Sequence, residues 1–198
     1  MASSTADITA VAVAVGLAAG RVFTAGQLAR LALEIEPTDG TLFPGIVAFD
    51  HRNGRWLRRL GPAPAILVTY IDTGGSVDTI EFNRRRLRYT SAQQRQIELA
   101  FEMIGHGLKS RDCGLLGAAA TISARVNQEI LPKPGLEEII DISATVGGFG
   151  VVVAHSGSVA GILHDQEAEG VERALAHMGV GEPATVKLID GGWRSRLS

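Results

Sequence analysis

The N-terminal segment constrains this chain most, because a long apolar run follows the first residues without interruption. Met1–Asp7 is rich in small and hydroxyl-bearing side chains, and Ile8–Leu17 carries no charge. At about ten residues, the apolar run is too short to span a bilayer. It has no basic region before it and starts directly after Asp7, which argues against a secretory signal peptide. A run of this kind is typical of the inside of a domain.

Two secondary structures are compatible with the apolar run. Its valines alternate with alanines, a period typical of a strand, at Val11, Val13 and Val15. The alanine content and the Ser3-Ser4-Thr5 cap favour a helix, so we predict a helix over Ala6–Ala19 that is buried on all sides. The hydroxyl groups at its start either cap the first turn or, with the unpaired N–H groups and the helix dipole, bind an anion such as phosphate.

The composition is that of a globular protein. The 198 residues are 45% hydrophobic and 20% charged, which excludes a disordered chain. The formal net charge of −2 argues against nucleic acid or an anionic membrane as the main partner. The single cysteine, Cys113, cannot form an internal disulfide and offers no zinc-binding spacing, which is typical of a reducing compartment. We therefore expect a cytoplasmic protein that has no membrane and no nucleic-acid partner.

Turn residues predict two domains. A second helix with an apolar face ends at Pro37, and the pair Asn53-Gly54 then joins two short apolar runs as a hairpin. The connector Gly61–Pro64 follows this hairpin. We therefore predict one domain over 1–60 and a second over 61–198.

The second domain combines strands and helices. Ala65–Ile71 is a nearly continuous apolar run, the pattern of a strand covered on both faces. Three helices are expected after it: one that begins at Ser91 with a capping box to Gln94, then Leu115–Val126 and Leu136–Ile142. A hairpin of two strands, Val151–Ala154 and Val159–Leu163, follows them. The last expected elements are a helix over Val171–Met178 and a strand over Ala184–Ile189. An antiparallel sheet with helices on one face accommodates this order, so the class is α+β.

Three other groups of residues could carry chemistry. Glu34 and Glu36 face the negative end of a helix dipole, which favours a bound cation nearby. The arginines of 83–88 form a solvated turn or contact the phosphates of a nucleotide. His155 and Ser156 are a base beside a hydroxyl, but adjacent strand residues point to opposite faces, so we do not expect a nucleophilic dyad.

Taken together, these motifs resemble the GHMP kinases, the superfamily named after galactokinase, homoserine kinase, mevalonate kinase and phosphomevalonate kinase. Met1–Ala6 is similar to the second half of the family's Gly-Leu-Gly-Ser-Ser-Ala phosphate loop. Glu36, in Glu36-Pro37-Thr38-Asp39-Gly40, stands where the family has a magnesium-binding glutamate. Gly147–Gly150 resembles the family's third, glycine-rich motif. These blocks, with Ala154–Gly161, are similar to the branch that phosphorylates L-threonine for cobalamin biosynthesis, associated with propanediol utilisation.

The resemblance implies a fold and a reaction. The implied fold is the remnant of a ribosomal-S5-like N-terminal domain, followed by a ferredoxin-like α/β sandwich. The implied reaction transfers the γ-phosphoryl group of ATP to the hydroxyl of L-threonine, a small-molecule substrate, with Mg²⁺ as the metal. The resemblance implies that the nucleotide is bound by Ala2, Ser3, Ser4 and Thr5, and the metal by Ser4 and Glu36. It implies that Asp39 acts in catalysis as a base, together with Glu36. It also implies that five residues lie near the phosphate or the substrate: Gly147, Gly148, His155, Ser156 and Gly157.

The resemblance begins in the middle of the phosphate loop. The strands that precede this loop in the family have no counterpart here, so we expect an N-terminally truncated chain. Such a chain exposes sheet edges and its apolar helix, which favours self-association as a homo-oligomer. Two alternatives stay open: a kinase for another hydroxy amino acid such as homoserine, and a catalytically impaired fragment that binds nucleotide or mediates assembly.

Overall fold

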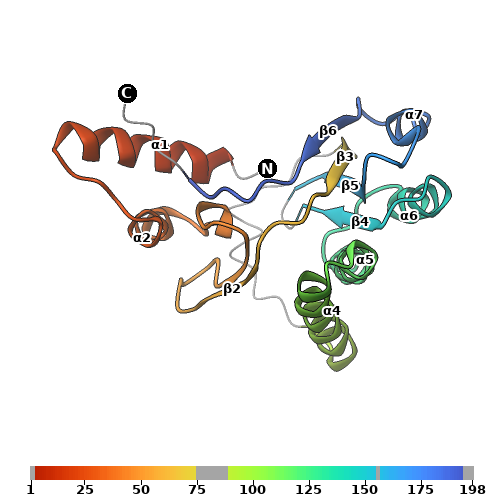
Figure 1. Cartoon of the computed structure of the whole chain (residues 1–198), viewed down its shortest axis with the longest axis horizontal. Coiled ribbons are helices and arrows are strands. Elements are labelled where there is room, and N and C mark those ends of the chain that lie inside the picture. Colours follow the sequence, from red (N-terminus) through yellow and green to blue (C-terminus); the bar gives the residue numbers. More distant parts are fainter. Residues whose placement is uncertain (1–2, 75–88, 155–156, 194–198) are drawn as a thin grey trace. The chain divides into compact units, whose positions relative to one another are not determined.

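The protein, seen in a computed structural model, is described over residues 3–74, 89–154 and 157–193, with side chains from Thr5 onward (Figure 1). The chain divides into two compact units. Unit 1 comprises Met1–Ala63 and the C-terminal segment that begins at Ile189, and unit 2 comprises Pro64–Leu188. The return of the C-terminal segment to unit 1 differs from the sequence prediction, which assigns all of 61–198 to the second domain. None of the helices in the described residues is long and apolar enough to cross a membrane.

The described residues of unit 1 form three helical segments and a hairpin. They are α1 (Ser3–Ala18), α2 (Ala25–Ile35), the 3-10 helix η1 (Gly40–Leu42), and the antiparallel strands β1 (Ile46–Phe49) and β2 (Leu57–Gly61). Thr24 begins α2 with a capping box, since its hydroxyl accepts the N–H of Gln27 while the Gln27 side chain accepts the N–H of Thr24. Gly54, with φ +62°, supplies the left-handed residue of the Asn-Gly hairpin loop.

The prediction that the N-terminal helix is buried on all sides is wrong. Helix α1 forms, but Val11 and Val15 are each 64% exposed. Ala12 and Val13 pack against the buried core of unit 1. Apolar composition shows that a helix is suited to burial, but the number of covered faces depends on which elements pack around it. Self-association through the exposed face stays a prediction.

Unit 2 is a four-stranded antiparallel sheet with helices. Its strands are β3 (Leu67–Asp72), β4 (Gly150–Val153), β5 (Val159–His164) and β6 (Ala184–Lys187), and its helices are α4 (Ser91–Ser110), α5 (Cys113–Gln128), α6 (Leu136–Thr145) and α7 (Val171–Ala176). The strands lie in the order β4-β5-β3-β6. This order, with helices between β3 and β4 and between β5 and β6, is the ferredoxin-like arrangement. The α+β class and the ferredoxin-like domain are confirmed.

The helices of unit 2 cover one face of its sheet (Figure 1). Helix α5 packs on β4, α6 on β4 and β5, and α7 on β3, while α4 packs on α5. The core between these layers is apolar and includes Ile71, Ile139, Val151, Ile162 and Leu175, all of them fully buried. Helix α4 begins one residue earlier than its predicted capping box, because Thr90 and Gln93 make the reciprocal hydrogen bonds expected of Ser91 and Gln94.

The backbones of α5 and β4 approach each other closely at two glycines. A Cβ atom on Gly117 would lie 2.0 Å from the carbonyl oxygen of Phe149, and one on Gly150 would lie 2.1 Å from the carbonyl oxygen of Gly117. The hydroxyl of Thr121 accepts the N–H of Val151 at 2.9 Å and donates to the Gly117 carbonyl at 2.9 Å. Strand β4 is an edge strand, so this helix covers it and satisfies one of its exposed N–H groups.

Gly117→Ala is expected to destabilise the protein, because the new methyl group overlaps the backbone of Phe149. Overpacking of this kind costs about 1–3 kcal/mol, and here the obstacle is backbone that cannot rotate away. Gly105→Ala in α4 is the matched control, since its Cβ meets nothing within 4 Å. We expect this control to be neutral or to stabilise by about 0.5–1 kcal/mol. Urea unfolding measures both, and equal stabilities of the two variants would contradict the packing argument.

Lys133, in the loop between α5 and α6, is a buried cation. The residue is 2% exposed, and its Nζ donates to Asn127 Oδ1 at 2.8 Å and to the Leu131 carbonyl at 3.5 Å. Both acceptors are uncharged. Burial therefore lowers the pKa of Lys133, because loss of water disfavours the ammonium form.

The stability of the protein should depend on pH through Lys133. Its folded pKa lies below the unfolded value of about 10.4, so the site contributes more stability as pH rises between these two values and loses it as pH falls through the folded pKa. Lys133→Met removes this titration. The free energy of unfolding of Lys133→Met minus that of wild type should therefore be highest near neutral pH and should fall toward about pH 10. Urea unfolding at a series of pH values measures the difference, and a constant difference would show that the buried ammonium has no such effect.

Candidate functional site

The hydroxyl-rich N-terminal residues form the first turn of α1, which begins at Ser3. Thr5 is 3% exposed, and its carbonyl accepts a hydrogen bond from Thr9 Oγ1 at 2.6 Å. Ala2 and the side chains of Ser3 and Ser4 lie outside the described part of the chain. The backbone N–H groups of a first helical turn have no intrahelical partner, so this end of α1 is suited to an anion.

A cavity of about 340 Å³ opens beside this first turn, within unit 1. Thr5 and Thr9 of α1 line it, with Thr41 and Leu42 of η1 and Trp193 of the C-terminal segment. The N–H of Trp193 donates to the Leu42 carbonyl at 3.2 Å, which holds the C-terminal segment beside η1. The cavity has the size of a small-molecule site and offers hydroxyl groups on a largely apolar wall.

Glu36 follows directly after α2. Its backbone is extended, its N–H donates to the Ala32 carbonyl at 2.9 Å, and its carbonyl accepts the hydroxyl of the buried Thr38 at 3.3 Å. Glu36 Oε1 is buried and has no hydrogen-bond partner among the described residues. A buried carboxylate oxygen without a partner is costly, and a bound cation satisfies such an atom.

Asp39 lies three residues beyond Glu36 at the start of η1. It is exposed, and its side chain makes no capping hydrogen bond, so the carboxylate is open to solvent. Within the described residues, no group of three or more His, Cys, Asp and Glu side chains could hold a metal. A cation at Glu36 therefore needs other oxygen ligands, such as hydroxyl groups, phosphate oxygens or water.

The predicted site glycines of unit 2, Gly147, Gly148 and Gly157, lie at two places. Gly147, with φ +75°, ends α6, and the N–H of Gly148 donates to the Ser143 carbonyl at 2.7 Å. A Cβ on Gly148 would lie 2.5 Å from Ser143 Oγ. Helix termination and packing thus explain these two glycines without a ligand. Gly157 lies at the other end of β4, about 13 Å away along the strand, so the structure does not bring it to Gly147 and Gly148.

His155, Ser156 and the arginines of 83–88 lie outside the described residues. Beside Gly157, however, the structure places a carboxylate that the sequence reasoning did not single out. Asp72 ends β3 opposite Val159, and its Oδ1 accepts the N–H of Gly74 at 3.0 Å. The signal for it was an acidic residue directly after a buried strand.

Asp72 belongs to a polar cluster at this end of the sheet. The N–H and the hydroxyl of Thr73 both donate to the Ser158 carbonyl, at 3.0 and 2.6 Å. The Ser158 hydroxyl and the Gly74 N–H lower the pKa of Asp72. The carboxylate is exposed and stays ionised to lower pH than an ordinary aspartate, so it can attract a cation or accept hydrogen bonds from a ligand.

Ser158→Ala should raise the pKa of Asp72 toward its ordinary value of about 3.9, because the largest stabilising hydrogen bond to the ionised form is lost. The NMR titration of the Asp72 carboxyl carbon measures this shift. Ser110→Ala is the control, since that hydroxyl bonds to the His106 carbonyl in α4 and should leave Asp72 unchanged. An unchanged titration in Ser158→Ala would contradict the assigned hydrogen bond.

Comparison with known proteins agrees with this architecture. The fold defines an α+β protein whose second unit is a ferredoxin-like domain. Residues 106–181 match the family described as GHMP kinases C terminal. This segment of unit 2 is therefore similar to the C-terminal domain of the GHMP kinases.

Two curated relatives match across both units. The L-threonine kinase of Salmonella typhimurium strain LT2 is 34% identical over 174 residues, which cover 87% of this chain and 58% of the relative. The L-threonine kinase of Citrobacter freundii is 33% identical over 173 residues, which cover 87% of this chain and 60% of the relative. The chain thus spans less than two thirds of the length of these two kinases.

Solved structures share the fold. A mevalonate kinase from L. major has a TM-score of 0.71 at 12% identity, covering 96% of this chain and 66% of its own. A homoserine kinase from Cytophaga hutchinsonii has a TM-score of 0.65 at 16% identity, covering 89% of this chain and 61% of its own. At these identities the likeness is one of fold.

Proposed function

We propose that this chain acts as an ATP-dependent kinase that phosphorylates the side-chain hydroxyl of L-threonine. The observation that carries the proposal is the 34% identity with an L-threonine kinase over 87% of the chain, which extends through both units. The product, O-phospho-L-threonine, suits a role in cobalamin biosynthesis. The work of such a site is to position two substrates and to neutralise charge, with little covalent chemistry by the protein.

The first turn of α1 is the proposed phosphate site. Backbone N–H groups of Ala2, Ser3 and Ser4, with Thr5 next along the turn, hold phosphate oxygens at the positive end of the helix dipole. Because the Thr5 side chain is buried, its contribution comes from the backbone and from lining the neighbouring cavity.

Glu36 and Ser4 are the proposed magnesium ligands. The buried, unpartnered Oε1 of Glu36 supports this role, because an oxygen held in that state is suited to a hard cation. A bound Mg²⁺ would neutralise charge on the phosphates. The chain's own part is to hold the carboxylate in place through the hydrogen bonds of Ala32 and Thr38 to the Glu36 backbone.

Asp39 is the proposed base for the threonine hydroxyl. Its exposed carboxylate is not used in capping, so it is available to accept a proton from a substrate. In unit 2, we assign His155, Ser156 and Gly157 to the substrate or phosphate region, together with the neighbouring Asp72. Gly147 and Gly148 are assigned to the structure of the α6–β4 turn.

The purified chain should consume ATP in the presence of L-threonine and Mg²⁺, and more efficiently than with L-serine. The methyl group that distinguishes the two substrates is worth about 10–200-fold in kcat/KM when it fills an apolar pocket. A coupled assay of ADP release with L-threonine, L-serine and L-homoserine measures the preference. If only L-homoserine is phosphorylated, the acceptor is L-homoserine and the proposed acceptor is wrong. If the chain binds nucleotide but phosphorylates none of the three amino acids, it is a nucleotide-binding module and the proposed kinase activity is wrong.

Glu36→Gln should reduce kcat at least about 100-fold, since a neutral amide is a poor ligand for Mg²⁺. Glu34→Gln is the matched control: it removes the same charge from the exposed surface of the last turn of α2, and its activity should stay near that of wild type. Both variants should unfold at the same urea concentration as wild type. Equal activity of the two variants would remove Glu36 from the metal site.

A further inference from the structure

A second and larger cavity lies within unit 1, and neither Glu36 nor Asp39 is among the residues that line it. It has a volume of about 740 Å³ and lies between α2 and the β1–β2 hairpin. Its lining comprises Gly26, Ala29, Arg30, Leu33 and Glu34 of α2, Phe43 and Phe49, Arg52 to Arg55 of the hairpin loop, and Leu57. We call this cavity the arginine groove. Its volume lies within the range of small-molecule sites.

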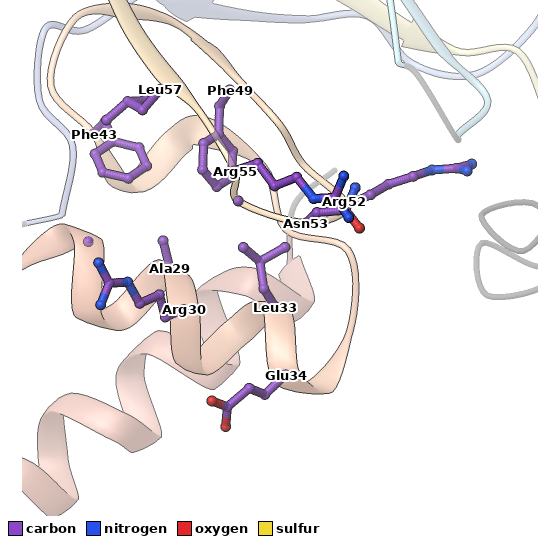
Figure 2. Close-up of a pocket in the computed structure, with 12 residues that line it drawn as sticks. Ala29, Arg30, Leu33, Glu34, Phe43, Phe49, Arg52, Asn53, Arg55 and Leu57 are labelled. Atoms are coloured by element: carbon purple, nitrogen blue, oxygen red, sulfur yellow. The ribbon is translucent and has the colours of Figure 1, made fainter.

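The floor of the arginine groove is apolar. The rings of Phe43 and Phe49 lie 5.4 Å apart and are tilted by 55°. Figure 2 shows these rings and Leu57 on one side of the groove, facing Ala29 and Leu33 of α2 on the other. Phenylalanine rings and branched aliphatic side chains favour an apolar ligand body.

The rim of the groove is positively charged. Arg30, Arg52 and Arg55 line it, whereas the carboxylate of Glu34 points away from the rings of the floor in Figure 2. Within the residues that the structure describes, neither Arg30 nor Arg55 makes an ion pair. The whole chain carries a formal net charge of −2, so the presence of three arginines in the lining of one cavity runs against its overall charge.

The hairpin loop holds its arginines in a defined backbone geometry. The Asp50 carboxylate accepts the backbone N–H groups of Arg52 at 3.2 Å, of Asn53 at 3.1 Å and of Arg55 at 3.4 Å. Burial raises the pKa of Asp50, but these hydrogen bonds outweigh it and the pKa is lowered. The loop also rests on α2, because a Cβ on Gly54 would lie 2.6 Å from Leu33 Cδ1.

We propose that the arginine groove binds a small organic anion, with an apolar or aromatic body against the phenylalanines and a carboxylate, sulfonate or phosphate at Arg55, while Arg30 adds positive charge on the opposite side of the groove (Figure 2). Guanidinium groups recognise planar and tetrahedral oxyanions through paired hydrogen bonds, and they are more readily desolvated than ammonium groups. An apolar floor alone would accept neutral ligands equally well. The three arginines make the groove selective for charge, and this site is independent of the proposed kinase reaction.

The test compares two dyes of similar shape that differ in charge, 1-anilinonaphthalene-8-sulfonate and the uncharged N-phenyl-1-naphthylamine. Fluorescence titration of the whole chain should show that the sulfonate binds at least tenfold more tightly at low salt and loses this advantage as salt is raised. Arg55→Gln should weaken the sulfonate about five- to tenfold and leave the neutral dye unchanged, and Arg30→Gln, on the opposite side of the groove, should weaken the sulfonate less. Equal binding of the two dyes to wild type would overturn the proposal.

The matched control is Arg58→Gln, which removes the same charge from exposed strand β2 outside the groove lining. An equal loss of sulfonate binding in Arg58→Gln and Arg55→Gln would show a diffuse charge effect and overturn the proposal. Thermal unfolding checks that the variants stay folded.

Leu33→Trp tests the location of the site independently, because a larger side chain in the floor of the groove should displace both dyes. Sedimentation at increasing protein concentration tests whether a second copy of the chain occupies the groove instead. A decrease in dye binding as a dimer forms would show that the second copy covers it and would overturn the proposal.

Discussion

The contact between α5 and β4 is the constraint on which unit 2 depends. Two glycines let a helix backbone approach a strand backbone more closely than any side chain would permit, and Thr121 bonds to both elements at the point of contact. This contact covers one edge of the sheet, whose strands β4 and β5 contribute Val151 and Ile162 to the apolar core. The polar cluster of Asp72, Thr73 and Ser158 sits at the end of that sheet, so its geometry follows from the registry of β3 against β5.

Unit 1 is organised around α2. One end of this helix begins with the Thr24 capping box, and the other leads into Glu36, whose backbone is held by Ala32 and Thr38 while one carboxylate oxygen stays buried and unpartnered. A different part of the same helix lines the arginine groove with Ala29 and Leu33. The helix thus contributes to two chemically different places: a carboxylate suited to a cation, and a cavity suited to an anion.

Several features were predictable from local sequence. The Asn53-Gly54 pair specified a hairpin because its loop needs a left-handed residue, and the order of strands and helices after the connector implied an antiparallel α+β unit. Other predictions failed where several elements meet. The alanine- and valine-rich α1 was expected to be buried on all sides, yet Val11 and Val15 are exposed. The composition of a helix does not determine how many other elements pack around it. For Gly147 and Gly148, helix termination and packing account for both glycines, and their proximity to phosphate or substrate stays a prediction.

The sequence by itself determined the secondary structure, the α+β class and the likeness to the GHMP kinases, since these depend on periodicity, turn chemistry and short motifs that are local in the chain. Only the tertiary structure decided which polar atoms lack partners and which charges share a cavity. Glu36 Oε1 lacks a hydrogen-bond partner among the described residues because of what packs around it, and Arg30 and Arg55 line the same cavity because the hairpin lies across from α2. Burial and proximity are properties of packing between distant segments, so no pattern along the chain could reveal them.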